Sequence, residues 1–187
     1  RDFVLLDAPI FTPNACEDST TLFEVTYFDE GKAYLTQSGQ MYLEAAIFSV
    51  GKCFDFGPVF RAEKSKTRRH LTEFWMMDAE AAFVEHEENM NIQEKLICAI
   101  IEKVLKVNEK ELGILERNIE PLMNVQAPFY RKTHKEVIAE LRAGGSNIGE
   151  NDDLGGDDET IFSQKFDRPI FVEKYPETSF MFKEERR

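Results

Sequence analysis

The chain has 187 residues, of which 42% are hydrophobic and 31% are charged. This length is typical of one domain, and this composition excludes a disordered chain or a fibrous repeat. The formal net charge of −12 argues against a general nucleic-acid coat and a binder of anionic membranes. No apolar stretch approaches the roughly 20 residues that a membrane helix needs, so we expect a soluble protein.

The start of the chain and its cysteines suggest where the protein works. The chain begins with Arg1 and carries no secretory signal, so we expect a segment of a longer protein. Cys16, Cys53 and Cys98 form no C-x-x-C pair and have no histidine at ligand spacing. This pattern argues against zinc and a disulfide framework, and it favours the reducing cytoplasm.

The first part of the chain alternates short strands with one helix. We predict strands at residues 3–6 and 22–28. The turn at residues 29–31 leads into another strand at 33–36, so these two strands should form a hairpin. Apolar residues at helical spacing, on good helix formers, predict a helix over residues 40–50.

A second strand pair is predicted around a basic loop. Residues 54–62, interrupted by Gly57-Pro58, and residues 73–83 should pair in antiparallel fashion. Because successive strand residues face opposite sides, Arg61 and Glu63 should share one face. A charged face beside an apolar one is typical of the rim of a cleft.

Two helices are predicted further along. Apolar residues at helical spacing from 86 to about 112 predict a long helix, whose apolar stripe we assign to the core. The sequence T-H-K-E is typical of a capping box, in which Thr133 caps the helix and the Glu136 side chain accepts a hydrogen bond from the backbone of Thr133. The second helix is therefore predicted to begin there. It should end at the glycine pair 144–145.

The last third predicts a loop and a strand. Residues 144–159 are rich in Gly, Asn and Asp and are predicted to form a mobile acidic loop. Calcium binding there is the weaker interpretation, because the ligand spacing of an EF-hand is missing. Residues 168–172 predict a final strand. Strands and helices thus mix irregularly, without a βαβ rhythm, which predicts an α+β fold with an antiparallel sheet flanked by helices.

Positive charge is concentrated at residues 61–70, RAEKSKTRRH, where five cationic side chains face one glutamate in an acidic chain. A solvated loop is one interpretation, but the contrast favours a phosphate-binding hairpin. The planar guanidinium of Arg61 suits two oxygens of a carboxylate, of a phosphate, or one of each. Arg69 and His70 offer donors to a polyphosphate, and Phe74 offers a ring on which a purine can stack.

These residues resemble the motifs of class II aminoacyl-tRNA synthetases. FRAE at 60–63 and RRHLTEF at 68–74 resemble motif 2, and DAPIFTP at 7–13 resembles the end of motif 1. LTQSGQMYLEA at 35–45 is similar to the amino-acid-binding segment of asparaginyl-tRNA synthetases, and KFDRPIFVEKYP at 165–176 to their downstream strand. The motifs keep the family's order over nearly the whole chain. Residues 1–187 therefore resemble a partial class II catalytic domain, in which motif 3 has no counterpart.

The resemblance implies a fold, a reaction and partners. The implied fold is an antiparallel sheet with flanking helices, usually dimeric through motif 1. In the implied reaction, asparagine and ATP form asparaginyl adenylate, and the acyl group then passes to tRNA(Asn) in the cytoplasm. Mg²⁺ is an implied cofactor, but no ligand for it can be identified in this segment. No membrane partner is implied.

The resemblance also implies two sets of ligands. The implied ATP ligands are Arg61, Glu63, Arg69, His70, Leu71 and Phe74. The implied amino-acid ligands are Glu17, Ser38, Gln40, Glu44 and Arg61. Arg61 is the implied catalytic residue, because it would hold both the α-phosphate and the substrate carboxylate as charge develops.

The choice of amino acid depends on residues 37–44, QSGQMYLE. The related aspartyl enzymes that this segment resembles carry a lysine at the position of Leu43, where it meets the aspartate carboxylate. Glu44 is the next residue. A carboxylate accepts a hydrogen bond from an amide NH₂ and repels a second carboxylate, so the chemistry favours asparagine.

Two other functions stay open. One is a paralogue that makes asparagine from aspartate through an adenylate, against which Glu44 counts. The other is a non-catalytic nucleotide-binding module, which the missing motif 3 would suit. For the same reason we expect this segment alone to be weak or inactive.

Overall fold

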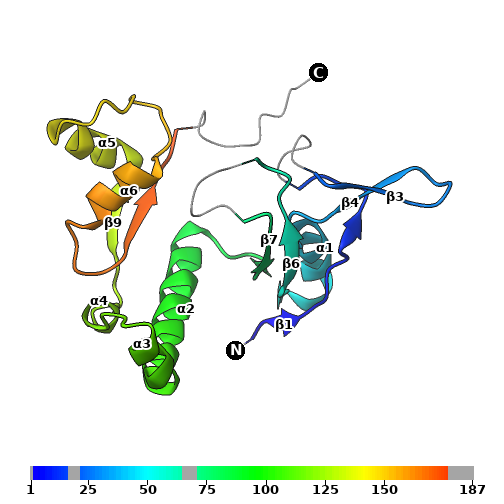
Figure 1. The fold of residues 1–187 in the computed structure, drawn as a ribbon, viewed down its shortest axis with the longest axis horizontal. Helices are drawn as coiled ribbons and strands as arrows, with labels where there is room; N and C mark the ends of the chain where they lie inside the picture. Colours follow the sequence, from blue (N-terminus) through cyan, green and yellow to red (C-terminus); the bar gives the residue numbers. More distant parts are fainter. Residues whose placement is uncertain (1, 17–21, 65–70, 177–187) are drawn as a thin grey trace. The chain divides into compact units, whose positions relative to one another are not determined.

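The computed structural model describes residues 2–16, 22–64 and 71–176. The chain forms two compact units, Arg1–Val84 and Glu85–Arg187, whose elements can be followed in Figure 1. The described part of the first unit contains β1 (Val4–Leu5), β2 (Phe11–Thr12), β3 (Glu24–Thr26), β4 (Lys32–Leu35), α1 (Gln40–Val50), β5 (Lys52–Phe54), β6 (Gly57–Phe60), β7 (Glu73–Met76) and β8 (Ala79–Ala81). That of the second contains α2 (His86–Val107), α3 (Glu109–Ile114), α4 (Glu120–Met123), β9 (Tyr130–Thr133), α5 (His134–Ala143), α6 (Gly156–Ser163) and β10 (Ile170–Glu173).

The predicted hairpin and the first helix are confirmed. Strands β3 and β4 pair in antiparallel fashion, with Val25 opposite Ala33, and β2 adds to the other side of β4. Gly31 has φ +111°, a value that favours glycine in the turn between them. Helix α1 has the predicted bounds and packs on β5 and β8, with Leu43 buried.

The second strand pair is confirmed, but each strand is broken once. Strand β6 pairs with β7 and β5 with β8, both antiparallel, while β1 joins β5 in parallel. The predicted interruption at Gly57-Pro58 is wrong, since both residues lie inside β6. Among the described residues β6 has β7 as its single partner, so the missing N–H of Pro58 can face away from the ladder. The break falls instead at Asp55 and Phe56.

The predicted long helix is two helices. It ends at Val107, and Asn108, with φ −117° and ψ 27°, separates α2 from α3. Asparagine suits such a break because its short polar side chain competes with helical hydrogen bonds. The assignment of the whole apolar stripe to the core is also wrong: Met90 is buried, but Ile100 is 48% exposed.

The capping box of α5 is confirmed. Thr133 Oγ1 accepts a hydrogen bond from Glu136 N at 3.3 Å, and Glu136 Oε2 accepts one from Thr133 N at 2.8 Å. The helix ends at Ala143, and Gly145 follows with φ +98°, as predicted. Its apolar face forms a core with the segment that follows, made of Val137, Ile138, Leu141, Ile148 and Phe162.

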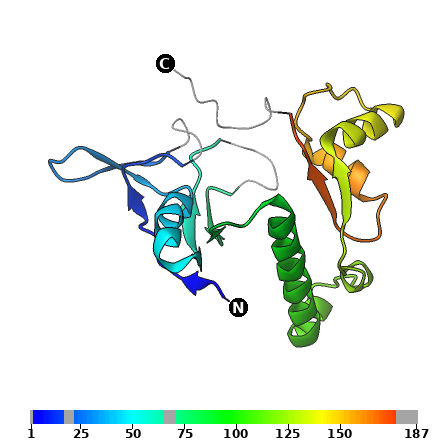
Figure 2. The same ribbon diagram turned by 180° about the vertical axis from the view of Figure 1, so that it is seen from behind.

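The final strand is confirmed, but its pairing was not predicted. Strand β10 lies parallel to β9, with Phe171 opposite Arg131. Figure 2 shows α5 beside this pair, on which it packs. The expectation of no βαβ unit is therefore wrong for the second unit, because parallel strands need a crossover and α5 and α6 supply it.

The predicted acidic loop is shorter than expected. Helix α6 begins at Gly156, so residues 156–159 are helical. Ser146 Oγ of the remaining loop donates to Asp158 Oδ1 of α6 at 3.1 Å, and within the loop Gly149 N donates to Asp152 Oδ2 at 2.7 Å. The mobility of the remaining residues stays a prediction.

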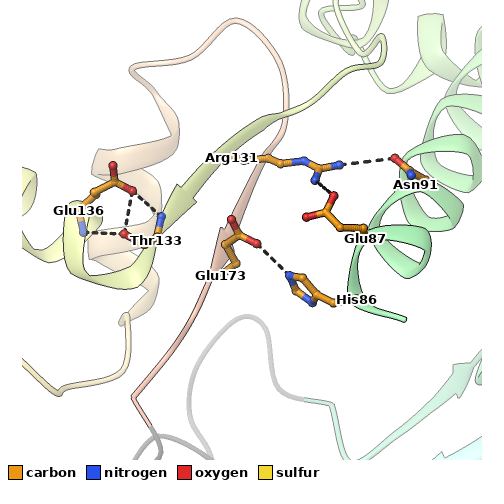
Figure 3. Close-up of polar contacts among 7 residues, drawn as sticks. All are labelled: His86, Glu87, Asn91, Arg131, Thr133, Glu136 and Glu173. Atoms are coloured by element: carbon orange, nitrogen blue, oxygen red, sulfur yellow. Dashed lines mark hydrogen bonds and ion pairs between the residues drawn. The ribbon is translucent and has the colours of Figure 1, made fainter. Parts of the chain in front are cut away.

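Ion pairs tie the start of α2 to β9 and β10, as Figure 3 shows. Arg131 on β9 pairs with Glu87 and donates to Asn91 on α2. His86 Nε2 lies 2.9 Å from Glu173 Oε2 on β10, and this contact lowers the pKa of Glu173. These polar contacts orient the helix within the second unit.

Candidate active site

Arg61 and Phe74 come together at the end of the β6–β7 hairpin where the connection between the two strands begins. Arg61 N donates to Thr72 O at 2.9 Å, which extends the ladder by one step beyond β6. The guanidinium of Arg61 lies over the Phe74 ring, 5.8 Å from its centroid, and its Nη1 donates to Gln37 O. A guanidinium oriented in this way presents a planar set of donors beside an aromatic face.

Gln37 connects the guanidinium to the N-terminal part of the unit. Its side chain is 1% exposed, and its Oε1 accepts a hydrogen bond from Cys16 N at 3.2 Å. Its backbone oxygen is the one that accepts from Arg61. A fully buried polar residue with partners on both sides fixes the geometry around it.

Ser38, Gln40 and Glu44 follow in one continuous set of contacts. Ser38 Oγ donates to Asp78 Oδ2 at 2.9 Å and accepts from Gln40 N at 3.1 Å. One turn along α1, Gln40 Nε2 donates to Glu44 Oε1 at 3.1 Å. The structure thus brings three of the predicted amino-acid ligands together at the start of α1. Glu44 is exposed, so it remains accessible to a ligand.

Carboxylates gather beside these residues. Burial, followed by the charges of Glu44 and Asp78, raises the pKa of Glu80. Burial and then the charge of Asp78 raise the pKa of Asp55. A group of carboxylates accepts hydrogen bonds from a neutral amide and makes the entry of another carboxylate unfavourable.

A cavity of about 300 Å³ borders the same turn on another side. Its lining includes Gly39, Asp55 and Asp78, together with the aromatic rings of Phe56 and Trp75. None of the predicted site residues that the structure describes is among its lining residues. This cavity is therefore a neighbour of the candidate site and not the site itself.

The remaining predicted residues are only partly placed. Glu63 and Leu71 are exposed, on the two sides of the connection between β6 and β7. Glu17, Arg69 and His70 lie outside the described residues, as does most of the basic loop. Their assigned contacts therefore remain predictions.

Sequence reasoning missed three residues of this region: Asp55, Asp78 and Glu80. One signal was available for two of them. In D-A-E, Asp78 and Glu80 are two residues apart within the predicted strand 73–83, which puts both on one face. Asp55 had no such signal, because a buried polar residue is recognised by its partners in space.

The described residues do not fit a metal centre. Across residues 2–16, 22–64 and 71–176, no group of three His, Cys, Asp or Glu side chains is arranged to hold a metal ion. The implied Mg²⁺ thus has no donor set in the described part of the chain, and no step is assigned to it. Within the same ranges, no helix has both the length and the apolar character to cross a membrane.

The fold and the site together define a class of protein. Mixed helices and small sheets, with an arginine and a phenylalanine paired on an antiparallel hairpin, are the architecture of a class II aminoacyl-tRNA synthetase. A model of the family described as tRNA synthetases class II (D, K and N) matches residues 1–187, and the chain belongs to this family.

Relatives within the family include asparagine–tRNA ligases. The chain is 48% identical over 188 residues to the one from Sorangium cellulosum, covering 94% of this chain and 42% of the relative. Among solved structures, it is similar to asparaginyl-tRNA synthetase from Pyrococcus horikoshii complexed with asparaginyl-adenylate. That match has a TM-score of 0.90 and 41% identity, and it covers 95% of this chain and 41% of the other.

A similar fold occurs in an enzyme named for a different amino acid, aspartate. Aspartyl-tRNA synthetase from Entamoeba histolytica matches with a TM-score of 0.70 and 31% identity, over 95% of this chain and 34% of that one. The chain thus spans about two fifths of the length of the curated relatives it matches.

Proposed function

We propose that this chain is part of the catalytic core of an enzyme that activates asparagine with ATP and transfers it to tRNA(Asn). The observation that carries the proposal is the Arg61 guanidinium, held between Gln37 O and the Phe74 ring beside Ser38 and Gln40. The names of the relatives support the same amino acid.

Arg61 acts in the first step. An oxygen of the asparagine carboxylate attacks the α-phosphorus of ATP, the bond to the β-phosphate breaks, and pyrophosphate leaves. Arg61 donates to the carboxylate and to the α-phosphate, which stabilises the charge that builds up between them. Phe74 stacks on adenine, and Glu63, Arg69, His70 and Leu71 complete the ATP site. Class II synthetases use Mg²⁺ with ATP, and the proposal places its ligands outside the described residues.

The amino-acid pocket selects asparagine. Glu17, Ser38 and Gln40 contact the substrate around its amino group, and Glu44 accepts from the side-chain amide. The crowding of Glu44, Glu80 and Asp78 supports this choice, because a second substrate carboxylate there would face like charge. In the second step, the terminal hydroxyl of tRNA attacks the acyl carbon, and AMP leaves.

The proposal includes a homodimer in the cytoplasm. The implied contact is the segment 7–13, where Ile10 and Phe11 are 42% and 54% exposed. Exposed apolar side chains of this kind favour association with another copy. Cys16, Cys53 and Cys98 are thiols and not halves of disulfides, which suits a reducing compartment.

Exchange of pyrophosphate into ATP by the full-length protein tests the proposed function. We expect exchange that depends on asparagine and is at least tenfold weaker with aspartate, since the second carboxylate must protonate or stay unpaired. Exchange driven by aspartate, with asparagine released as product, would instead mark an asparagine-making paralogue. ATP binding without exchange would mark a non-catalytic module.

A further inference from the structure

A buried carboxylate lies directly on the turn that opens α1. Asp55 is 6% exposed, and a β-carbon placed on Gly39 would lie 1.7 Å from Asp55 Oδ2. Gly39 has φ −80°, a value that any residue adopts. A side chain at position 39 would therefore have to displace the Asp55 carboxylate, although the backbone itself would not be strained.

Asp55 also holds the residue that anchors this turn. Its N–H donates to Asp78 O at 3.0 Å, and its Oδ1 accepts from Asp78 N at 3.3 Å. Asp78 Oδ2 in turn accepts from Gly39 N and Ser38 Oγ, both at 2.9 Å. The contacts form a closed ring that runs from Asp55 through Asp78 to the turn and back.

The position of the amino-acid ligands follows from this ring. Ser38 is a member of it, and Gln40 N donates to Ser38 Oγ at 3.1 Å. Gly39 lies between Ser38 and Gln40 in the chain, so a shift of Gly39 moves both of these proposed ligands. Asp55 lies 17 positions after Ser38 in the sequence and belongs to none of the segments assigned to substrate.

We propose that Asp55 is a positioning residue for the amino-acid pocket, which acts by packing on Gly39 and by holding Asp78. The inference rests on the proposed function, in which Ser38 and Gln40 bind asparagine. Asp55 acts through its neighbours and not by contact with substrate. Asp55 takes no part in the contacts of Arg61 with Gln37 and Phe74, so its loss should affect the ATP side less than the amino-acid side.

The test compares two substitutions at Asp55 in the full-length protein. Asp55→Ala removes the acceptor for Asp78 N and the carboxylate over Gly39, so KM for asparagine should rise about tenfold while KM for ATP changes less than about twofold. Asp55→Asn keeps the shape and the acceptor, and it mimics the neutral acid that burial favours, so KM for asparagine should stay within about threefold of wild type. Asp29→Ala, at an exposed turn residue, is the matched control.

A double substitution isolates the contact with Gly39. Gly39→Ala alone should raise KM for asparagine, because its methyl group meets the Asp55 carboxylate. Asp55→Ala makes room for that methyl group, so the double variant should be no worse than Asp55→Ala alone. Additive losses in the double variant would overturn the proposal.

Hydrogen exchange keeps this inference separate from the proposed function. Asp55→Ala should speed exchange of the Gly39 amide, which donates to Asp78, and Asp55→Asn should not. If wild type does not activate asparagine, the proposed function fails, and the exchange result still decides the positioning role. Unchanged exchange at Gly39, or equal rises in KM for both substrates, would overturn the inference.

Discussion

Arg61 is oriented before any substrate arrives. Arg61 directly follows β6, and its backbone N–H donates to Thr72 O. Its guanidinium donates to Gln37 O and lies over the Phe74 ring. A side chain fixed in this way loses little freedom when it grips a carboxylate and a phosphate. At the residue scale, the proposed chemistry depends on this preorganised arginine.

Substitution of Arg61 should weaken asparagine activation, and the size of the loss should depend on the residue that replaces it. Charge-assisted hydrogen bonds of about 1.5 to 3 kcal/mol imply a loss of at least tenfold for each contact removed by Arg61→Ala. Arg61→Lys keeps the charge but not the planar grip, so it should lie between alanine and wild type. Exchange of pyrophosphate into ATP by the full-length protein measures both.

The matched control for Arg61 is Arg117→Ala, an exposed arginine in the second unit. Its exchange rate should equal that of wild type. Equal rates for Arg61→Ala and wild type would remove Arg61 from the mechanism.

Glu44 should determine the preference for asparagine. Glu44→Gln keeps the size of the side chain and its contact distance to Gln40, but it removes the charge that repels aspartate. Asparagine activation should weaken, and the asparagine-to-aspartate ratio of kcat/KM should narrow by about tenfold or more. An unchanged ratio would show that Glu44 is only a surface partner of Gln40.

At the scale of elements, α5 depends on its first turn. The capping box satisfies two backbone N–H groups that the helix cannot pair internally. The face that follows carries the core of the second unit. The start of this helix is therefore a point where one side chain influences the packing of many.

Loss of the cap should destabilise the second unit. Thr133→Ala should lower the free energy of unfolding by about 1 kcal/mol, the usual cost of losing such a cap. Thr160→Ala, inside α6, is a control whose hydroxyl bonds within its own helix. Urea unfolding followed by circular dichroism measures the free energy of unfolding of both variants. Equal unfolding midpoints for Thr133→Ala and wild type would contradict the role of the cap.

The same cap predicts a pH dependence. Hydrogen bonds from the backbone and side chain of Thr133 lower the pKa of Glu136. A lowered folded-state pKa stabilises the fold above the ordinary glutamate pKa of about 4.3, and this contribution is lost as pH falls through the lowered value. Glu136→Gln should therefore be less stable than wild type at pH 7, and the difference should disappear in acid. A difference that is constant with pH would contradict the assignment.

Local elements could be predicted from the sequence, but distant pairings could not. Residues 40–50 and the T-H-K-E box contain their own signals of spacing and capping, and both helices begin where predicted. Strand β9 has no comparable signal, because it pairs with β10 across α5 and α6. In the site, Arg61 and Phe74 were predictable from one hairpin, whereas the bond between Ser38 and Asp78 joins residues 40 positions apart.

At the scale of the whole molecule, the chain spans about two fifths of its relatives' length. Each of its two units has a buried core of its own: Leu43, Cys53 and Val59 in the first, and the α5 and α6 residues in the second. The proposed ATP site lies on one hairpin, and the described residues contain no group of three His, Cys, Asp or Glu side chains arranged to hold a metal ion. We thus expect this segment to be long enough to fold, whereas full catalysis should need more of the protein than this segment.

The chain alone should fold but turn over weakly. ATP should stabilise it only slightly, by about 0.4 kcal/mol when its concentration equals the dissociation constant. Thermal unfolding with and without ATP, together with pyrophosphate exchange, measures both expectations. Turnover equal to that of the full-length protein would contradict the assigned importance of the rest of the enzyme.

Charging of tRNA(Asn) by the full-length protein tests the central claim most directly. The protein is incubated with ATP, the tRNA and labelled asparagine or labelled aspartate at equal concentration, and the label esterified to tRNA is counted. Asparagine should be esterified, aspartate should not, and Arg61→Ala should lose the reaction. Esterified aspartate, or no aminoacyl-tRNA with either amino acid, would contradict the proposed function.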